Sequence, residues 1–423
     1  MYDAIAFHLM LVSLANFVSL GLLLLLVANF PAVVWFWWRL RRPSIPPADQ
    51  RLPKAAVVLC LRGADPTLER CLEGLLTQDY PDYEVVIIID HPSDPAWDVV
   101  QAAIQRHRQV VVRIEPLRVP ADSCSLKCSS LVQAISGLKD SCEVVALLDA
   151  DTVPPADWLR ALVAPLGDPR VGATTGVRWF MPAPATWASV VRYHWGAAAT
   201  AACHTLGIAW GGTLAIKREV FRRQQLLEKW STAYCEDAMT RSILKPLGLR
   251  LQMVPNLVMV NHESCTLRGF FGWCVRQVLI VRLYHSAWWI ILGHGFISVL
   301  AFVVPALLMV WGALQQDGRS AGLIGLSALG YWLALWIEML IVEASVRRAV
   351  RRRGQPASWL TISALAKSFF AIPFSQVIYG GALAAACTVR RVCWRGIWYD
   401  IEGPWKVKMR SYRPHSAGSA SAQ

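Results

Sequence analysis

The chain has 423 residues, of which 55% are hydrophobic and only 17% are charged, and its formal net charge is +13 at pH 7. This length suits one large domain or two smaller ones, and the apolar excess excludes an ordinary soluble protein. Much of the positive charge lies beside apolar stretches, which favours a membrane surface and argues against a nucleic-acid partner. These basic residues are Arg39, Arg41, Arg42, Arg347, Arg348, Arg351, Arg352, Arg353, Arg390, Arg391 and Arg395.

Four apolar stretches are each long enough to cross a membrane, which takes about 20 residues of helix. They lie at residues 9–38, 286–314, 321–342 and 369–389. The first stretch is too long for the core of a signal peptide and lacks a basic region before it, so residues 1–40 are expected to be a retained transmembrane anchor. The sequence thus predicts an integral membrane protein, of a bacterial inner membrane or an equivalent one.

The positions of the arginines also predict the topology. By the positive-inside rule, the N-terminus lies outside and residues 53–265 form a cytoplasmic domain. An amphipathic segment, residues 266–285, is expected to lie along the membrane surface. The second and third apolar stretches then form a hairpin whose loop, residues 315–320, lies outside.

The fourth apolar stretch leaves two topologies open. If it crosses fully, the basic tail at residues 390–423 lies outside, against the charge rule. If it is re-entrant, or if residues 359–367 contribute to a second pass, the tail is cytoplasmic. Pro373 and the two glycines that follow it at residues 380–381 favour a broken or re-entrant segment. We therefore expect residues 286–389 to be a transmembrane or re-entrant region followed by a cytoplasmic tail.

Within the cytoplasmic domain, short apolar runs alternate with a helical pattern. The runs lie at residues 55–61, 85–89 and 144–148. They are typical of strands buried on both faces of a parallel sheet, and residues 66–78 show helical spacing between the first two. The β-α-β order predicts an α/β fold whose ligands bind beyond the carboxyl ends of the strands. Asp90 and Asp149 directly follow strands at that edge.

Asp149 and Asp151 follow a run of apolar residues with one residue between them. Carboxylates at this spacing can converge on one cation where the chain turns, and Mg²⁺ and Mn²⁺ prefer oxygen ligands and bridge to substrate phosphates. The alternative is a loop with two solvated acids, because the pattern alone is common. Asp90 has a similar pair of interpretations: its carboxylate can accept from a base or a ribose, or it can belong to an ordinary turn.

Further candidates are two neighbouring acids, a pair of glycines and a lysine. Glu236 and Asp237 precede a helical pattern, where acids suit the helix dipole, but one of them can also act as a general base. Gly211 and Gly212 allow a close backbone approach to a ligand or simply form a turn. Lys127 lies near an expected helix start and is either a phosphate ligand or a surface lysine.

Arg276 and Gln277 lie in the amphipathic segment that precedes the second apolar stretch. Their simplest role is to anchor this segment at the membrane surface, and the same role is expected of Arg268 and Arg282. A catalytic role for Arg276 is the alternative.

These motifs, in this order, resemble the family 2 glycosyltransferases and, more narrowly, the ceramide glucosyltransferase group. The resemblance covers most of the chain and is carried by residues 62–66 (RGADP), 78–85 (QDYPDYEV), 90–96 (DHPSDPA) and 394–399 (WRGIWY). It implies a GT-A-type, Rossmann-like cytoplasmic domain joined to transmembrane helices. It also implies an inverting, metal-dependent transfer of a hexose, glucose from UDP-glucose, to a membrane lipid, with ceramide as the acceptor.

The resemblance implies roles for individual residues. Asp90 would contact the uridine, Asp149 and Asp151 would hold the Mg²⁺ or Mn²⁺ and the diphosphate, and Asp237 would be the base. Arg276 would be the arginine of the family's Gln/Arg-x-x-Arg-Trp motif, but Gln277 stands where the tryptophan is expected. The candidate catalytic residues are thus Asp237 and Arg276, the metal ligands Asp149 and Asp151, and the donor-binding residues Asp90, Lys127, Asp149, Glu236 and Gln277.

Three other functions compete with this one. A diacylglycerol glucosyltransferase differs only in its lipid acceptor. A processive polysaccharide synthase needs more membrane helices and an intact arginine–tryptophan motif. A nucleotide-sugar-binding membrane protein without catalysis is disfavoured because Asp90, Asp149, Asp151 and Asp237 are all present.

Overall fold

The computed structural model describes residues 2–41, 52–357 and 361–416. A seven-stranded sheet forms the centre of the domain, in the order β3-β2-β1-β4-β6-β5-β7. The strands are β1 (Ala55–Leu61), β2 (Tyr83–Ile89), β3 (Val111–Pro116), β4 (Val144–Leu148), β5 (Val171–Phe180), β6 (Thr213–Lys217) and β7 (Arg250–Asn261). The first four are parallel, β6 is antiparallel to both of its neighbours, and β5 is parallel to β7.

This mixed sheet confirms the predicted α/β fold. The expected strands at residues 55–61 and 144–148 have the predicted bounds, and β2 begins two residues before the predicted 85. The expected helix at residues 66–78 is the shorter α2 (Leu68–Leu76). Continuous apolar runs were sufficient to predict these strands because both faces of the central strands are buried.

The two faces of the sheet belong to two separate hydrophobic cores. In β1, Val57 and Leu59 face α2, α3 (Ala96–Arg106) and α5 (Trp158–Val163), whereas Ala56 and Val58 face α4 (Leu126–Ser136) and the elements that follow it. This alternation is the period-two geometry of a strand. Of the shorter helices α7 (Arg218–Arg223), α8 (Leu226–Trp230) and α9 (Thr240–Leu244), α8 packs against α4 and α7, and α9 packs against β5 and β7.

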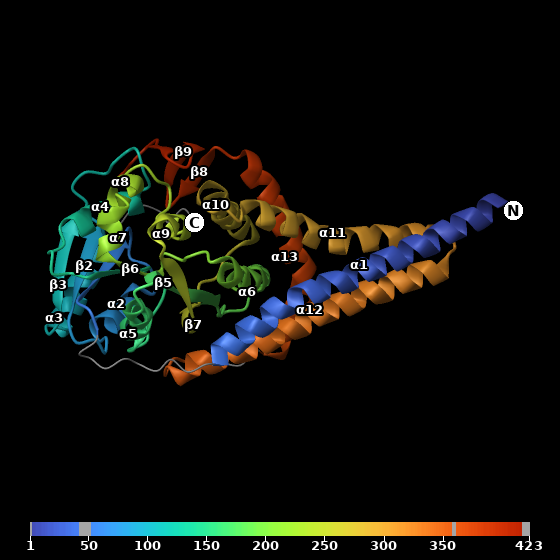
Figure 1. Ribbon diagram of the computed structural model, residues 1–423, viewed down its shortest axis with the longest axis horizontal. Helices are drawn as coiled ribbons and strands as arrows, with labels where there is room; N and C mark the ends of the chain where they lie inside the picture. Colours follow the sequence, from blue (N-terminus) through green and yellow to red (C-terminus); the bar gives the residue numbers. More distant parts are fainter. Residues whose placement is uncertain (1, 42–51, 358–360, 417–423) are drawn as a thin grey trace.

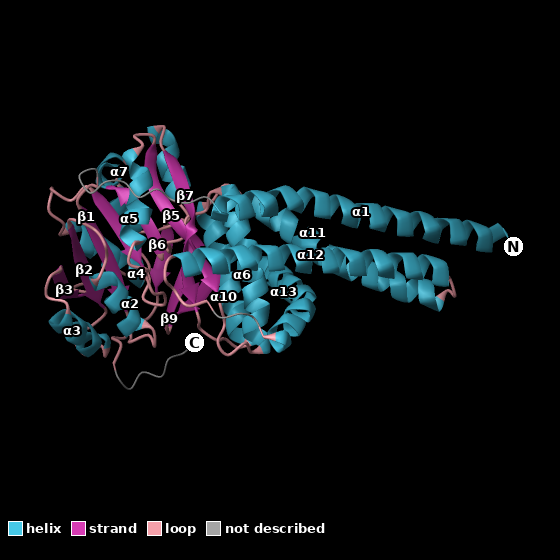
Figure 2. Ribbon diagram, turned by 90° about the horizontal axis from the view of Figure 1, so that it is seen from below, coloured by secondary structure: helices cyan, strands magenta, loops and turns pink. Residues whose placement is uncertain are grey.

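Among the described residues, four helices are long and apolar enough to cross a membrane. Three of them, α1 (Tyr2–Arg41), α11 (Trp288–Leu314) and α12 (Gly318–Arg352), extend together away from the domain (Figures 1 and 2). The N-terminal end of α1 and the turn between α11 and α12 lie at the same far end, as the predicted topology requires (Figure 1). The side of the membrane on which the domain lies stays a prediction.

The fourth apolar helix, α13 (Ile362–Thr388), does not follow the other three. It lies steeply across them at the junction with the domain (Figure 1) and packs against α6 (Trp187–Leu206), α10 (Leu267–Tyr284) and α11. Residues 362–367 belong to the start of this helix and Thr361 caps it, whereas residues 359–360 of the alternative second pass lie outside the described residues. The amphipathic segment that was expected at the membrane surface is α10, and α13 covers it.

The predicted basic tail is largely a folded part of the domain. Residues 391–409 form a three-stranded antiparallel sheet of β8 (Arg391–Trp394), β9 (Ile397–Gly403) and β10 (Lys406–Met409). Its inward side chains, such as Tyr399 and Ile401, join the hydrophobic core that contains α4. The sequence analysis missed this sheet because its strands are short and rich in charge.

A buried polar cluster joins the membrane helices to the central sheet. Glu343 of α12 is 2% exposed and forms an ion pair with Arg347 one turn later. Its Oε2 also accepts hydrogen bonds from Trp179 Nε1 of β5 and the Tyr193 hydroxyl of α6, both at 2.7 Å. A charge buried in this way requires such partners, so the cluster fixes how α12 meets the domain.

Candidate active site

The candidate site lies at the carboxyl edge of the sheet, where β4 ends at Leu148. The next residues form a turn that other segments hold in place. Thr67 Oγ1 donates to the Ala150 carbonyl at 3.0 Å, and Thr152 Oγ1 donates to the Asp149 carbonyl at 3.1 Å. The turn therefore presents Asp149 and Asp151 from a fixed backbone.

Lys127 connects two of the predicted acids. The Ser125 hydroxyl caps α4 by accepting from the Cys128 amide, which places Lys127 in the first turn of this helix. The Lys127 amine lies 2.7 Å from Asp149 Oδ1 and 2.7 Å from Glu236 Oε1. Its side chain is only 17% exposed, so the interpretation as a surface lysine is wrong.

The charges in this group shift one another's pKa. Burial opposes the charge of Lys127, but the carboxylates of Asp149 and Glu236 outweigh it and raise the pKa of the amine well above its usual value. Burial also raises the pKa of Glu236, and Lys127 acts in the opposite direction. For Asp149 the amine prevails over burial, and the pKa is lowered.

Gly211 and Gly212 bring the acids together because neither position has room for a side chain. The Gly211 amide donates to Asp237 Oδ2 at 2.7 Å. A Cβ at Gly211 would lie 2.1 Å from Glu236 Oε1, and one at Gly212 would lie 2.6 Å from Asp149 Oδ2. The run is thus more than an ordinary turn: it lets the backbone pass between three carboxylates.

Asp151 retains a free acceptor that a metal could use. Its Oδ2 accepts from Asn261 Nδ2 at 3.1 Å, whereas its Oδ1 is buried and has no hydrogen-bond partner among the described residues. Burial, and then the neighbouring Asp149, raise the pKa of Asp151 to about 6. No group of three or more potential ligands occurs in the described part of the chain. Two carboxylates still fit Mg²⁺ or Mn²⁺, which take water and substrate phosphates as their other ligands.

Asp90 lies at the end of β2 and is 1% exposed. It forms an ion pair with Arg62, and its Oδ2 accepts from the His415 amide at 2.9 Å. The Tyr412 hydroxyl donates to the Asp90 carbonyl at 3.3 Å. Its Oδ1 is buried without a partner among the residues described, so it remains available to a ligand. The segment that follows β10 thus lies against Asp90.

The candidates on α10 form no hydrogen bond or ion pair with the acid cluster among the described residues. The Arg276 guanidinium stacks on Trp394 of β8, with 5.0 Å between its Cζ and the ring centre. No hydrogen bond of the Gln277 side chain occurs within the described ranges, and its role in donor binding stays a prediction. Arg282, expected to be a membrane anchor, donates to the carbonyls of Ala386 and Val389 and so caps the end of α13.

Sequence reasoning missed two arginines near the acids. Arg395 forms an ion pair with Asp65 at 2.9 Å and donates to the Arg62 carbonyl at 2.8 Å. Arg178 lies on β5, and it is close enough to Asp149 for their charges to interact. Arg395 lies within the WRGIWY motif, which could have marked it as a site residue. The sequence of β5 has no motif that would mark Arg178.

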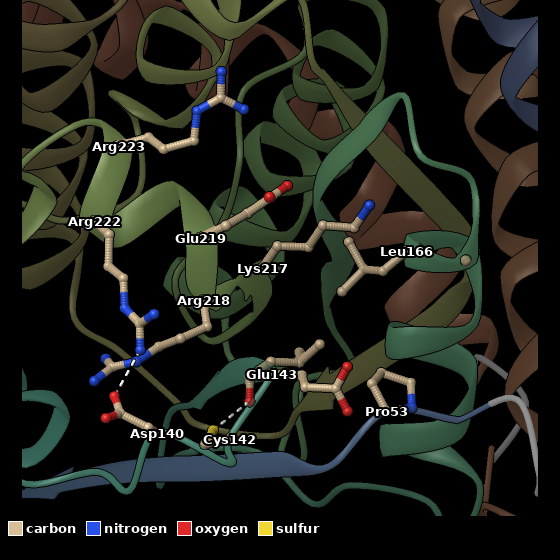
Figure 3. A pocket seen from close by; sticks show the side chains of 12 residues that line it. Pro53, Asp140, Cys142, Glu143, Leu166, Lys217, Arg218, Glu219, Arg222 and Arg223 are labelled. Carbon is tan, nitrogen blue, oxygen red and sulfur yellow. Dashed lines mark hydrogen bonds and ion pairs between the residues drawn. The ribbon is translucent and has the colours of Figure 1, made fainter.

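A hollow of about 580 Å³ lies at the opposite edge of the sheet, where β4 begins and β6 ends (Figure 3). Arg222 and Asp140 form an ion pair at its rim, at 2.6 Å. None of the candidate residues lines it, so it is not the site that the sequence predicted.

Comparison with known proteins points to a single class of enzyme. A family model described as "Glycosyl transferase family 21" matches residues 21–406. The chain is 31% identical over 68 residues to a ceramide glucosyltransferase of Komagataella phaffii, a match that spans 16% of this chain and 13% of that relative.

Two solved structures are also similar. One is a mannosyltransferase of Pyrobaculum calidifontis in complex with GDP-Man and Mn²⁺, at 20% identity over 88% of this chain and 97% of that one, with a TM-score of 0.46. The other is the glucosyl-3-phosphoglycerate synthase of Mycobacterium tuberculosis, at 16% identity over 57% of this chain and 85% of that one, with a TM-score of 0.38.

Proposed function

The chain belongs to glycosyltransferase family 21, and from this premise we propose that it transfers glucose from UDP-glucose to the hydroxyl of a membrane lipid, ceramide. Membership confirms the resemblance to membrane glycosyltransferases. The observation that carries the proposal is the cluster in which Lys127 links Asp149 to Glu236 while Gly211 holds Asp237 beside them. This arrangement combines a diphosphate site with a carboxylate for proton transfer.

Asp237 is the base in the proposed reaction. The Gly211 amide and the Cys235 thiol, at 2.7 and 3.0 Å, donate to its two oxygens and fix its orientation. Asp237 takes the proton of the lipid hydroxyl while the hydroxyl oxygen bonds to the anomeric carbon of the sugar. The bond from that carbon to the diphosphate breaks in the same displacement, which inverts the configuration.

Asp149 and Asp151 would hold the Mg²⁺ or Mn²⁺ ion, which supplies positive charge to the departing diphosphate. Without the ion, Lys127 already neutralises part of the charge on Asp149. Asp90 would receive the uridine with its free Oδ1, because a buried carboxylate oxygen favours an N–H or O–H donor.

The acceptor is proposed from the position of the membrane helices. α6, α10 and α13 pack together between the domain and the other apolar helices, so the acid cluster lies on a domain that adjoins the lipid (Figure 2). The proposed orientation has the domain in the cytoplasm, as the positions of the arginines favour. Diacylglycerol is the closest alternative acceptor.

The test is an assay of the purified full-length protein with UDP-glucose, other nucleotide sugars and a panel of lipids. We expect a lipid carrying one glucose from ceramide, loss of turnover with EDTA, and recovery with Mn²⁺ or Mg²⁺. Asp237→Ala should abolish transfer while UDP binding persists. A long polymer would support a synthase instead, and nucleotide binding without turnover would support a non-catalytic protein.

A further inference from the structure

Arg178 lies on the part of β5 that extends past its pairing with β6 and pairs only with β7. β5 pairs with β6 as far as Thr175, which lies opposite Leu214, and β6 begins at Thr213. The following residues of β5 therefore continue past the start of β6. This brings Arg178 next to Trp210, the residue that precedes the two glycines of the acid cluster.

Three aromatic rings surround the guanidinium of Arg178. Its Cζ lies 5.2 Å from the ring centre of Phe180, 5.1 Å from that of Trp210 and 5.0 Å from that of Trp273. Stacking on aromatic faces restricts a planar guanidinium and leaves its N–H edge to bind an anion. Trp273 occupies the first position of the altered motif on α10, so the departure from the family pattern supplies one of these rings.

Two neighbouring cations already have partners, whereas Arg178 has none among the residues that the structure describes. Arg395 pairs with Asp65, and Arg192 lies 3.6 Å from Glu263. Within the described part of the chain, no hydrogen bond or ion pair of the Arg178 side chain occurs. Its edge is therefore available to a ligand that carries negative charge.

The surrounding charges indicate which ligand this is. Burial lowers the pKa of Arg178, Asp151 and Asp149 oppose this change, and the nearby Arg276 adds to it. An arginine stays protonated in proteins even so. Trp210, against which Arg178 lies, also borders Gly212, where a Cβ would be 2.6 Å from Asp149 Oδ2. Arg178 is thus a cation beside the two acids that fit a metal–diphosphate complex.

We infer that Arg178 is the anion site that binds the β-phosphate of the departing nucleotide. This inference rests on the proposed function. As the bond between the anomeric carbon and the β-phosphate oxygen breaks, its electron pair goes to that oxygen, and the diphosphate gains negative charge. A fixed guanidinium stabilises this charge through paired N–H···O bonds that strengthen during the step.

The test compares two nucleotides on the purified full-length protein in detergent with Mn²⁺. UDP carries the β-phosphate and UMP lacks it, so calorimetry with each isolates the contact in question. Arg178→Met is expected to weaken UDP binding about 10-fold, to leave UMP binding unchanged, and to lower kcat about 100-fold. The matched control, Arg223→Met, removes an exposed arginine at the opposite edge of the sheet and should change neither value.

The outcomes distinguish a failure of the inference about Arg178 from a failure of the proposed transferase function. Unchanged UDP binding and kcat in Arg178→Met, or an equal loss of UDP and UMP binding, would overturn the inference and leave the transferase intact. If Arg178→Met does not fold, Arg178→Lys allows the same comparison, with an intermediate loss expected for UDP alone. If the unaltered protein binds neither nucleotide, the proposed uridine donor is wrong and the inference falls with it.

Discussion

At the scale of single residues, Lys127 stabilises the acid cluster by neutralising its carboxylates. Lys127→Met would leave Asp149 and the buried Glu236 without the amine that lies 2.7 Å from each. Breaking a buried ion pair in this way costs on the order of 3 kcal/mol. We therefore expect a lower unfolding temperature as well as loss of transfer. Lys139→Met, at an exposed position on the same side of the sheet, is the control and should unfold like the unaltered protein.

Gly211 tests the geometry of the same cluster without changing its charge. In Gly211→Ala the new Cβ would lie 2.1 Å from Glu236 Oε1, so either the loop or the carboxylate must move. A displacement of about 1 Å at a catalytic group can cost about 100-fold in rate, and we expect kcat/KM to fall by this order. Gly167→Ala has no atom within 4 Å of its new Cβ and serves as the control. Equal activity of the two variants would contradict the proposed site.

The acids of this site could be predicted, but their partners could not. Asp90 and Asp149 were found because each directly follows an apolar strand, which is a local feature. Lys127 and Glu236 meet only in the folded chain, and the link between Asp90 and His415 joins residues 325 positions apart. A single sequence contains no periodicity that encodes such contacts.

At the scale of elements, strands buried on both faces were predicted well and the others were not. β1 and β4 are continuous apolar runs, whereas the charged strands β8 and β10 bury only alternate residues. The amphipathic pattern of α10 suggested a surface helix. In the structure its apolar residues pack on α6 and α13 instead, because another apolar helix covers it. The hydrophobic pattern of a helix indicates that one face is buried, but it does not identify the element that covers this face.

The segment after β10 is expected to hold the donor site closed. Removal of residues 410–423 would delete the His415 amide from Asp90 and the Arg413 carbonyl that accepts from Arg62 at 3.0 Å. We expect the KM for UDP-glucose to rise several-fold with a smaller change in kcat, since the acid cluster itself is untouched. Removal of residues 417–423 alone keeps both contacts and is the control. A lower KM after the longer deletion would mean that the segment obstructs the donor instead.

At the scale of the whole molecule, the structure relates the tail to the catalytic domain. Tyr399 is buried in the core, and its hydroxyl accepts from the Leu126 amide at 3.3 Å, so the tail lies on the same side of the membrane as the acid cluster. With α1, α11 and α12 as spans, the turn between α11 and α12 lies at the opposite end (Figure 1). The charge rule predicts that this side, with the domain and the tail, is the cytoplasmic one.

Cysteine labelling tests this orientation directly. In a background without other cysteines, Cys393, which is exposed on β8, should react with a membrane-impermeant maleimide only after the cells are permeabilised. Gln316→Cys, in the exposed turn between α11 and α12, should react in intact cells and proves that the reagent reaches the outer face. Labelling of Cys393 in intact cells would show the opposite orientation. The site would then lie outside the cell, where it could not bind a cytoplasmic nucleotide-sugar.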